Sequence, residues 1–305
     1  MNYTLNQLRI FLKVAELQSV TKASEELHLT QPAISIQLKK FQDQFEIPLT
    51  EIIGRRLYVT DFGKDIARAC ERILDEVHNI KYKAEAYKGQ LVGQLKISVV
   101  STAKYVIPYF ISDFLRQHPA IDLQIDVTNK AQVIQSLEQN QVDLASVSVL
   151  PRDLNVNSIE LMSNQLYLVV GRSLIGKEKN KKDFLKQVPL IFREKGSATR
   201  AAMEEYLFKQ KVVIGKKIEL TSNEAVKQAV IAGLGCSIMP IIGIKNELKN
   251  KDLFIVDQKQ LPIKTMWRLI WLNQKKFTPV TEAFLTFIQN EKERIIAEEF
   301  NWFSK

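Results

Sequence analysis

The apolar positions near the start of the chain recur at helical spacing. Between residues 5 and 15 they follow the i, i+3, i+4, i+7 pattern of an amphipathic helix: Leu5, Leu8, Phe11, Leu12 and Ala15. Ser19 or Thr21 can cap a second helix, which ends at residues 28–29. Thr30 can then cap a third helix, with Pro32 in its first turn, where a missing N–H costs nothing. The pattern therefore predicts a tight turn between the second and third helices, with the third helix set sharply across the second.

The third predicted helix has two different faces. Ile34, Leu38 and Phe41 form its apolar stripe. The residues on the opposite side, with Gln31 at the helix start, are Pro32, Ser35, Ile36, Lys39 and Lys40. No acidic residue occurs from residue 30 to residue 40. Such a helix suits a DNA major groove, with short side chains near base edges and lysines near phosphates. A solvated helix in another small helical domain fits the same spacing, which leaves both interpretations open.

A basic turn follows this helical region. Two β-prone runs, residues 52–53 and 57–60, flank Gly54, Arg55 and Arg56, which predicts a small hairpin with arginines at its tip. Arginines placed there can reach phosphates or the minor groove. An ordinary charged turn is the alternative, but a helix–turn–helix followed by a basic hairpin is more specific than either part alone.

A long helix is predicted to begin after Thr60. Its apolar positions are separated alternately by four and three residues: Ile66, Cys70, Ile73, Val77, Ile80, Ala84 and Tyr87. This is a heptad repeat, which favours a two-helix seam between subunits. Packing of the helix on its own domain is the alternative. Residues 88–93 then break the helix and are typical of a linker.

From residue 95 onward the pattern alternates between strands and helices. Strands are expected at residues 95–100, 121–127, 144–149, 167–170, 190–192 and 267–272, and residues 233–240 lead into a further, buried strand. Helices are expected at residues 104–117, 133–139, 199–208, 224–231 and 278–299. This alternation implies an α/β fold whose sheet has at least some parallel strands.

Two hydroxyl-rich segments follow predicted strands and open predicted helices. Ser101 and Thr102 come after the first strand, and Ser197 and Thr199 come after the strand near residue 192. In α/β sheets, ligands bind at the carboxyl ends of strands against helix N-termini. The two segments could therefore hold an anion or a polar small molecule. Ordinary helix caps use the same residues, so either segment alone is weak evidence.

The net charge of +9 is unevenly distributed. Residues 1–88 carry 13 basic and 12 acidic side chains, whereas residues 172–217 carry 13 and 5. The DNA-binding interpretation therefore rests on local placement of charge. In the second region Arg193 and Arg200 flank the segment 196–199, which favours an anionic ligand. Other lysines there are typical of a solvated run: Lys177, Lys179, Lys181 and Lys182.

The remaining composition excludes several classes. The 305 residues, 46% hydrophobic and 25% charged, suit an ordinary globular protein of two domains. No apolar run approaches the ~20 residues of a membrane span, and the first residues do not form a signal peptide. We therefore expect a cytoplasmic protein without a membrane partner.

No catalytic motif is present, and we expect neither an enzyme nor a cofactor. The three histidines, at positions 28, 78 and 118, lack metal-ligand spacing, so no metal site is expected. Cys70 and Cys236 lie in apolar patterns and read as buried thiols.

Several segments resemble the LysR-type transcriptional regulators. In the first part these are residues 19–24 (SVTKAS), 29–35 (LTQPAIS) and 60–63 (TDFG), and further on residues 191–200 (IFREKGSATR) and 232–240 (AGLGCSIMP). Residues 101–105 (STAKY) and 117–119 (QHP) look like the CbbR-like branch, named for regulators of carbon-fixation operons. Three segments depart from the family pattern: Ile36 stands where many members have arginine, and residues 49–52 (LTEI) and 146–151 (SVSVLP) are unusual.

The resemblance implies a winged helix–turn–helix domain (residues 1–61), a linker and dimerisation helix (62–88) and a periplasmic-binding-protein-like effector domain (93–305). The effector domain should have two lobes, lobe I at approximately 93–164 and 268–305 and lobe II at approximately 165–267. Carried over by position, Gln31, Pro32, Ser35 and Ile36 should face bases, and Arg55 and Arg56 the backbone or minor groove. Lys39, placed on the same face by its spacing, should lie near phosphates. Those lining the effector cleft are Ser101, Thr102, Ser197 and Thr199. The dimer helix uses Ile66, Ile73, Val77 and Ile80.

The resulting hypothesis is a homodimeric or homotetrameric regulator that binds an interrupted palindromic operator and responds to a small, anionic effector. Three alternatives fit the sequence less well. A solute-binding protein would fit the α/β part alone, an enzyme fused to a DNA-binding domain lacks a catalytic set, and a thiol redox sensor lacks a nearby cysteine pair.

Overall fold

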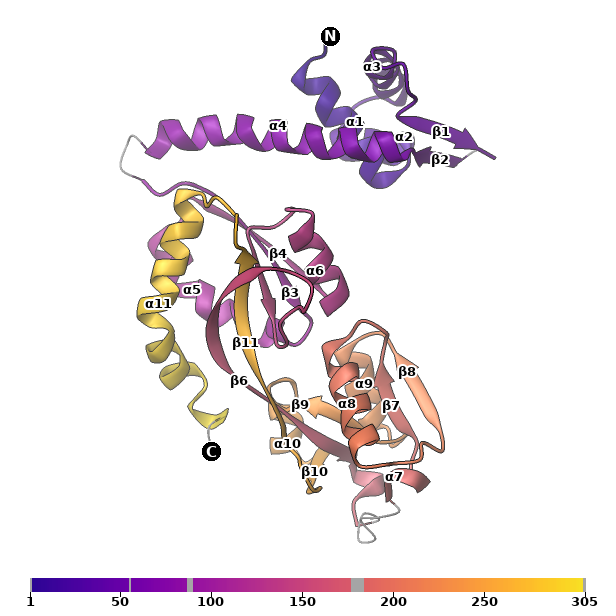
Figure 1. Ribbon diagram of the computed structural model, residues 1–305, viewed down its shortest axis with the longest axis vertical. Helices are drawn as coiled ribbons and strands as arrows, with labels where there is room; N and C mark the ends of the chain where they lie inside the picture. The colour runs from indigo at the N-terminus through magenta and orange to yellow at the C-terminus, as the bar shows by residue number, and fades with distance from the viewer. Residues whose placement is uncertain (1, 55, 87–89, 177–183, 304–305) are drawn as a thin grey trace. The chain divides into compact units, whose positions relative to one another are not determined.

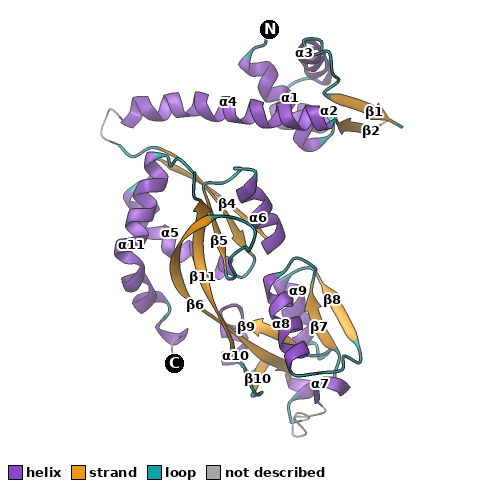
Figure 2. Cartoon of the chain, viewed as in Figure 1, coloured by secondary structure: helices purple, strands orange, loops and turns teal. Residues whose placement is uncertain are grey.

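The computed structural model describes residues 2–54, 56–86, 90–176 and 184–303, leaving aside the side chains of residues 78, 79 and 81–86. The chain forms two compact units, Met1–Gln90 and Leu91–Lys305, and each unit has its own hydrophobic core. Figure 1 labels their helices and strands, and Figure 2 shows that the first unit is mostly helical whereas the second combines strands and helices.

The first unit contains the predicted helix–turn–helix and hairpin. Its elements are α1 (Leu5–Leu17), α2 (Val20–Leu27), α3 (Gln31–Gln42), β1 (Thr50–Ile53), β2 (Arg56–Val59) and α4 (Asp61–Ala86). Ser19 caps α2 by accepting a hydrogen bond from the Lys22 amide. Thr30 occupies the N-cap of α3 without a side-chain bond, and Pro32 lies in the first turn. The local predictions are therefore confirmed, except that Thr30 does not cap α3 through its hydroxyl.

The core of the first unit holds α3 against α1. Ile34, Leu38 and Phe41, the predicted apolar stripe, are buried, and the Phe41 ring lies 5.2 Å from that of Phe11. On the same side, the Gln7 side-chain amide donates a hydrogen bond of 3.2 Å to Gln37. The burial of this stripe fixes which side of α3 faces outward.

The apolar stripe of α4 divides into two parts. Ile66 packs partly buried against the core of the first unit, and Cys70 is buried within it. Further along, Ile73 is 41% exposed and Ile80 is 64% exposed, with Val77 between them also exposed. The helix therefore packs on its own domain at its start, and only the later part leaves apolar side chains uncovered in one chain.

The second unit is built on a curled mixed sheet. Its strands lie in the order β10 (Leu253–Val256), β6 (Val156–Gly171), β11 (Ile263–Leu272), β5 (Leu144–Val147), β3 (Gly93–Val100), β4 (Ile121–Thr128), with β9 (Ser237–Pro240) also paired to β6. The strand β3 runs parallel to β4 and β5, and β11 runs antiparallel to β5 and β6. A second, two-stranded sheet pairs β7 (Leu190–Arg193) in parallel with β8 (Lys217–Leu220). The α/β fold with some parallel strands is confirmed.

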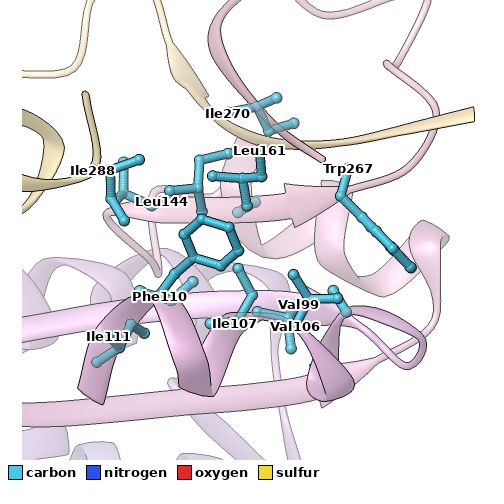
Figure 3. Packing of buried hydrophobic residues seen from close by; sticks show 14 of the residues in the cluster. Val99, Val106, Ile107, Phe110, Ile111, Leu144, Leu161, Trp267, Ile270 and Ile288 are labelled. Atoms are coloured by element: carbon cyan, nitrogen blue, oxygen red, sulfur yellow. The ribbon is translucent and has the colours of Figure 1, made fainter. Parts of the chain in front are cut away.

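Two groups of buried residues define two lobes in this unit. In lobe I, the side chains of β3, β5 and β11 pack against α5 (Ile107–Gln117), α6 (Lys130–Glu138) and α11 (Pro279–Glu299). Figure 3 shows Phe110, Leu144 and Trp267 among the side chains of this core. In lobe II, β7 and β9 are covered by α7 (Phe184–Gln187), α8 (Ala198–Lys209), α9 (Asn223–Ile231) and α10 (Lys245–Lys249). The strands β6 and β11 continue from one lobe into the other, as Figure 1 shows.

Several elements differ from the sequence-based expectation. β6 is a 16-residue strand that begins at Val156, whereas only its residues 167–170 were expected. The first half lacks a clear apolar pattern because it is exposed and polar on one face. The exposed charged strand β8 and the short β10, α7 and α10 were not predicted. After β3, only a three-residue turn of 3-10 helix, Ala103–Tyr105, follows Thr102, and α5 begins at Ile107 without a side-chain cap.

Candidate DNA-binding surface and effector-binding site

The outward face of α3 carries the side chains predicted to meet DNA. Gln31, Pro32, Ser35 and Lys39 are exposed, and Ile36 is 54% exposed. Lys39 lies in the last turn of the helix, beside Lys40, and neither makes an ion pair within the part of the chain that the structure describes. Among the described residues, these two lysines therefore have no ion pair to break when a polyanion approaches.

The hairpin of β1 and β2 forms a second basic element. Gly54 sits at its tip with φ +55°, a backbone conformation that favours glycine. Arg56 is exposed and makes no ion pair among the described residues. Arg55 lies outside the residues that the structure describes.

A groove of about 540 Å³ joins the hairpin to the start of α2. It is lined by residues 17–22 on one side and by Ile52 and residues 56–58 on the other. Lys22 and Arg56 bring positive charge to this groove. Sequence reasoning missed it because its two walls are thirty or more residues apart and meet only in the folded domain.

In the second unit, Arg193 links the two lobes. It ends β7, its side chain is 4% exposed, and its Nη2 donates a hydrogen bond of 3.2 Å to the Ser101 hydroxyl at the end of β3. Nε and Nη2 also bind both carboxylate oxygens of Glu194, at 2.7 and 2.8 Å. Nη1 donates to Oδ1 of Asn223, the first residue of α9. Ser101, Arg193 and Asn223 come from three separate segments of the chain, which only the fold brings together.

Arg200 supports this cluster from α8. Its Nη1 donates a hydrogen bond of 3.0 Å to the Arg193 carbonyl oxygen, and its side chain pairs with Glu204 and Glu219 at 2.8 and 2.7 Å. The hydrogen bond from Arg200 lowers the pKa of the Glu219 carboxyl. Arg200 therefore stabilises the position of Arg193. Because its charge is already paired with two carboxylates outside the Arg193 cluster, it is not a free anion-binding group.

The four predicted cleft residues fall on two sides of one interlobe contact. Ser101 bonds Arg193, and Thr102 beside it is buried. Thr199 lines a gap of about 10 Å³ shared with Arg193 and Asn223. Ser197 instead caps α8 and lines an open groove of about 1110 Å³ that runs from α6 to α8. The structure thus brings Ser101 and Thr199 to the Arg193 cluster and places Ser197 toward the groove.

The helix starts near this cluster also differ from the prediction. Ser101 and Thr102 precede only the short 3-10 turn, so their segment provides no α-helix N-terminus. The start of α9 takes that place, since Asn223 begins it and Ser222 caps it. The lysines at 177, 179, 181 and 182 lie outside the described residues.

The lobes approach each other closely at Gly196. Its φ is +88°, and a Cβ built there would lie 3.2 Å from the Ala131 Cβ and 3.4 Å from the Asn129 side-chain oxygen. Ala131 and Asn129 belong to the start of α6 in lobe I. A glycine is needed here both for the backbone conformation and for the close approach.

Neither cysteine is poised for redox chemistry. Burial raises the pKa of the Cys70 thiol to about 11 and that of Cys236 to about 12. Both are free and lie in separate units. The described residues contain no cluster of histidine, cysteine and carboxylate side chains suited to a metal ion, and among them no helix is long and apolar enough to cross a membrane.

Comparison with protein families identifies the two units. The model described as "Bacterial regulatory helix-turn-helix protein, lysR family" matches residues 5–64, and the one described as "LysR substrate binding domain" matches residues 88–293. The chain belongs to the LysR family. It is a DNA-binding transcriptional regulator with a domain for a small-molecule effector, not an enzyme, and the alternative of a solute-binding protein is not supported.

Individual LysR-family relatives cover nearly the whole chain. A RuBisCO operon transcriptional regulator of Allochromatium vinosum is 34% identical over 97% of this chain and 98% of its own length. The HTH-type transcriptional activator CmpR of Synechocystis is 32% identical over 98% and 99%. These relatives confirm the predicted resemblance to regulators of the carbon-fixation branch.

Solved structures show the same architecture. The LysR-family regulator CbnR is 21% identical with a TM-score of 0.69, over 95% of this chain and 99% of that one, which confirms the fold. The regulatory domain of Synechocystis PCC6803 CcmR, solved in complex with 2-PG, is 32% identical with a TM-score of 0.61, over 66% of this chain and 98% of that domain.

Proposed function

We propose that this LysR-family regulator reads its operator with α3 and the β1–β2 hairpin. Gln31, Pro32, Ser35 and Ile36 would face base edges, while Lys39, Arg55 and Arg56 would contact phosphates or the minor groove. The exposure of the described members of this set, and the absence of ion pairs to Lys39 and Arg56 among the described residues, support the proposal. Ile36 would make an apolar contact such as one to a thymine methyl group.

We further propose a symmetric dimer, or a tetramer built from such dimers, held by α4. Ile73, Val77 and Ile80 would form the seam, because they are exposed in one chain and lie at heptad spacing. Ile66 contributes less, because it packs on its own domain. In this organisation residues 1–61 bind DNA, 62–88 form the dimer helix and 93–305 form the effector domain in the cytoplasm, with lobe I at approximately 93–164 and 268–305 and lobe II at approximately 165–267.

The effector is proposed to be a small anion bound at the Arg193 cluster, a phosphorylated carboxylate such as 2-phosphoglycolate. The single observation that carries this proposal is the buried guanidinium of Arg193 between the lobes. Buried arginine binds carboxylate and phosphate through paired, charge-assisted hydrogen bonds. Similarity to the CcmR domain, whose structure holds 2-PG, supports this ligand class.

Thr102 and Thr199 are proposed to bind the anion beside Arg193, with Ser101, while Ser197 sets the start of α8. Calorimetry of the full-length protein with 2-phosphoglycolate, glycolate and the neutral amide of glycolate tests the ligand class. Thr102→Val keeps the shape and removes a hydroxyl, so 2-phosphoglycolate binding should weaken by ~1–3 kcal/mol while DNA binding without effector is unchanged. Tighter binding of the neutral amide, together with an unaffected Thr102→Val variant, would show that the anion site is wrong.

A further inference from the structure

The carboxylate that now binds Arg193 belongs to the next residue along the chain. Glu194 places one oxygen on Nε and the other on Nη2, at 2.7 and 2.8 Å. This is the two-point arrangement that a carboxylate or phosphate ligand makes with arginine. The Glu194 side chain is largely buried with Arg193. The protein therefore supplies its own anion at the position where the proposed effector would bind.

Two of the three remaining N–H donors of Arg193 are also taken. Nη1 bonds the Asn223 side-chain oxygen, and Nη2 bonds the Ser101 hydroxyl. The gap next to this cluster has a volume of only about 10 Å³, room for roughly one water molecule. An anionic ligand larger than water can reach the paired donors of Arg193 only if the Glu194 carboxylate leaves them.

The side-chain amide nitrogen of Asn223 is unused within the cluster. Asn223 is 6% exposed, and its Nδ2 has no hydrogen-bond partner among the described residues. Its Oδ1 is fixed toward Arg193, which can only donate, so the amide group points elsewhere. Asn223 lines the same small gap as Arg193 and Thr199. A buried, unpaired N–H is costly, and a ligand oxygen in this gap would satisfy it.

We propose that Glu194 is an intramolecular competitor of the effector and thereby sets the affinity that an anion needs in order to bind. This inference rests on the proposed anion site. An incoming monocarboxylate exchanges one carboxylate for another at Arg193 and gains little. A phosphate dianion carries more charge to the same donors and can also accept from Asn223 Nδ2, so it displaces Glu194 where a monocarboxylate does not.

The competitor also stabilises the protein without effector. With Glu194 bound, the buried guanidinium is neutralised, and the lobes are held by the bond from Arg193 to Ser101. Loss of the Glu194 charge should therefore lower the melting temperature of the free protein and strengthen anion binding at the same time. A residue that only shaped the turn between β7 and α8 would weaken both properties together.

The test is calorimetry and thermal unfolding of full-length Glu194→Gln with three probes: 2-phosphoglycolate, glycolate and the neutral amide of glycolate. Both anions should bind roughly tenfold more tightly than to the parent, which corresponds to about 1.4 kcal/mol, and the amide should not change. The free variant should melt lower than the parent, and saturating 2-phosphoglycolate should raise its melting temperature by more than it raises that of the parent.

A matched control removes the same charge nearby. Glu204 pairs with Arg200 on α8 and makes no bond to Arg193, so Glu204→Gln should leave the affinity for both anions within about twofold of the parent. If Glu194→Gln fails to fold, Glu194→Asp replaces it, because the shorter carboxylate keeps the charge but cannot hold both nitrogens in the same pose. That variant should bind both anions more tightly than the parent as well.

The outcomes separate the two proposals. If the parent binds none of the anions, or binds them independently of Thr102, the anion site itself is wrong. If the parent binds 2-phosphoglycolate and Thr102→Val weakens it, but a folded Glu194 variant binds no more tightly, the site stands and the competitor role is overturned.

Discussion

The two ligand surfaces of this protein differ in what their charged side chains do before a ligand arrives. On α3 and the hairpin, Lys39 and Arg56 are exposed and make no ion pair among the described residues. In the effector domain, Arg193 is buried and almost fully hydrogen bonded. DNA brings its own dense charge, so a solvated cation serves it at no folding cost. A small ligand needs a desolvated site, and a buried charge there requires an internal partner.

The largest expected effect comes from breaking the internal partner set. Arg193→Ala leaves Glu194 and the Asn223 oxygen without their donor inside the protein. Stability should fall by ~3–5 kcal/mol, as for other buried pairs that lose one member, and 2-phosphoglycolate binding should be lost. Urea unfolding of the effector domain measures the first effect, and calorimetry measures the second.

The control for this variant is Arg268→Ala, which breaks a more exposed pair with Glu160 on neighbouring strands. It should cost no more than about 1 kcal/mol. Equal losses of stability in the two variants would contradict the distinction between buried and exposed arginines.

Next in size is the proposed dimer seam. Ile73→Asp places a charge in an apolar interface, and the dimer should weaken by several kcal/mol, so that sedimentation at micromolar concentration detects monomers. Ile73 is 41% exposed in the single chain, so the fold of the first unit should survive. A variant that stays dimeric would move the interface away from this part of α4.

The DNA surface is tested at its centre by Ser35→Glu. The added carboxylate should face the bases and phosphates and abolish operator binding, while Ser35→Ala should retain most of it. Because Ser35 is exposed, circular dichroism should show an unchanged helix content and melting temperature. Operator binding equal to that of the parent would remove α3 as the recognition helix.

The interlobe contact can be tested with a pair of glycines. Gly196→Ala combines strain at φ +88° with a tight contact to Ala131, whereas Gly176→Ala has φ +84° and nothing within 4 Å. We expect the first to cost ~1–2 kcal/mol more than the second, since backbone strain is common to both. Equal thermal stabilities would mean that the lobes separate easily at this point.

The smallest effect is expected at the phosphate contacts. Lys39→Ala should weaken binding to all DNA sequences alike and reduce the slope of log K against log salt by about one. Fluorescence anisotropy between low and physiological salt measures this slope. A loss confined to the specific operator would instead place Lys39 at a base edge.

Most of the first unit follows from its sequence alone. Its helix starts, its buried stripe of Ile34, Leu38 and Phe41, and the exposed opposite face follow from contacts three and four residues apart. The alternating strands and helices of the second unit were equally readable, apart from exposed strands such as β8, whose polar face carries no apolar pattern. Local periodicity decides such elements, so one sequence is enough to see them.

The hydrogen-bond partners in the effector site, by contrast, depend on the folded arrangement. The segment 191–200 was recognised, but nothing in it shows that Arg193 pairs with its neighbour Glu194 and reaches Ser101 and Asn223, 92 and 30 residues away. The split of the α4 stripe, with Ile66 inside and Ile73 outside, depends likewise on where α1 lies. A buried polar group takes whichever partner the folded chain brings within hydrogen-bonding distance, and that choice is made by packing between distant segments.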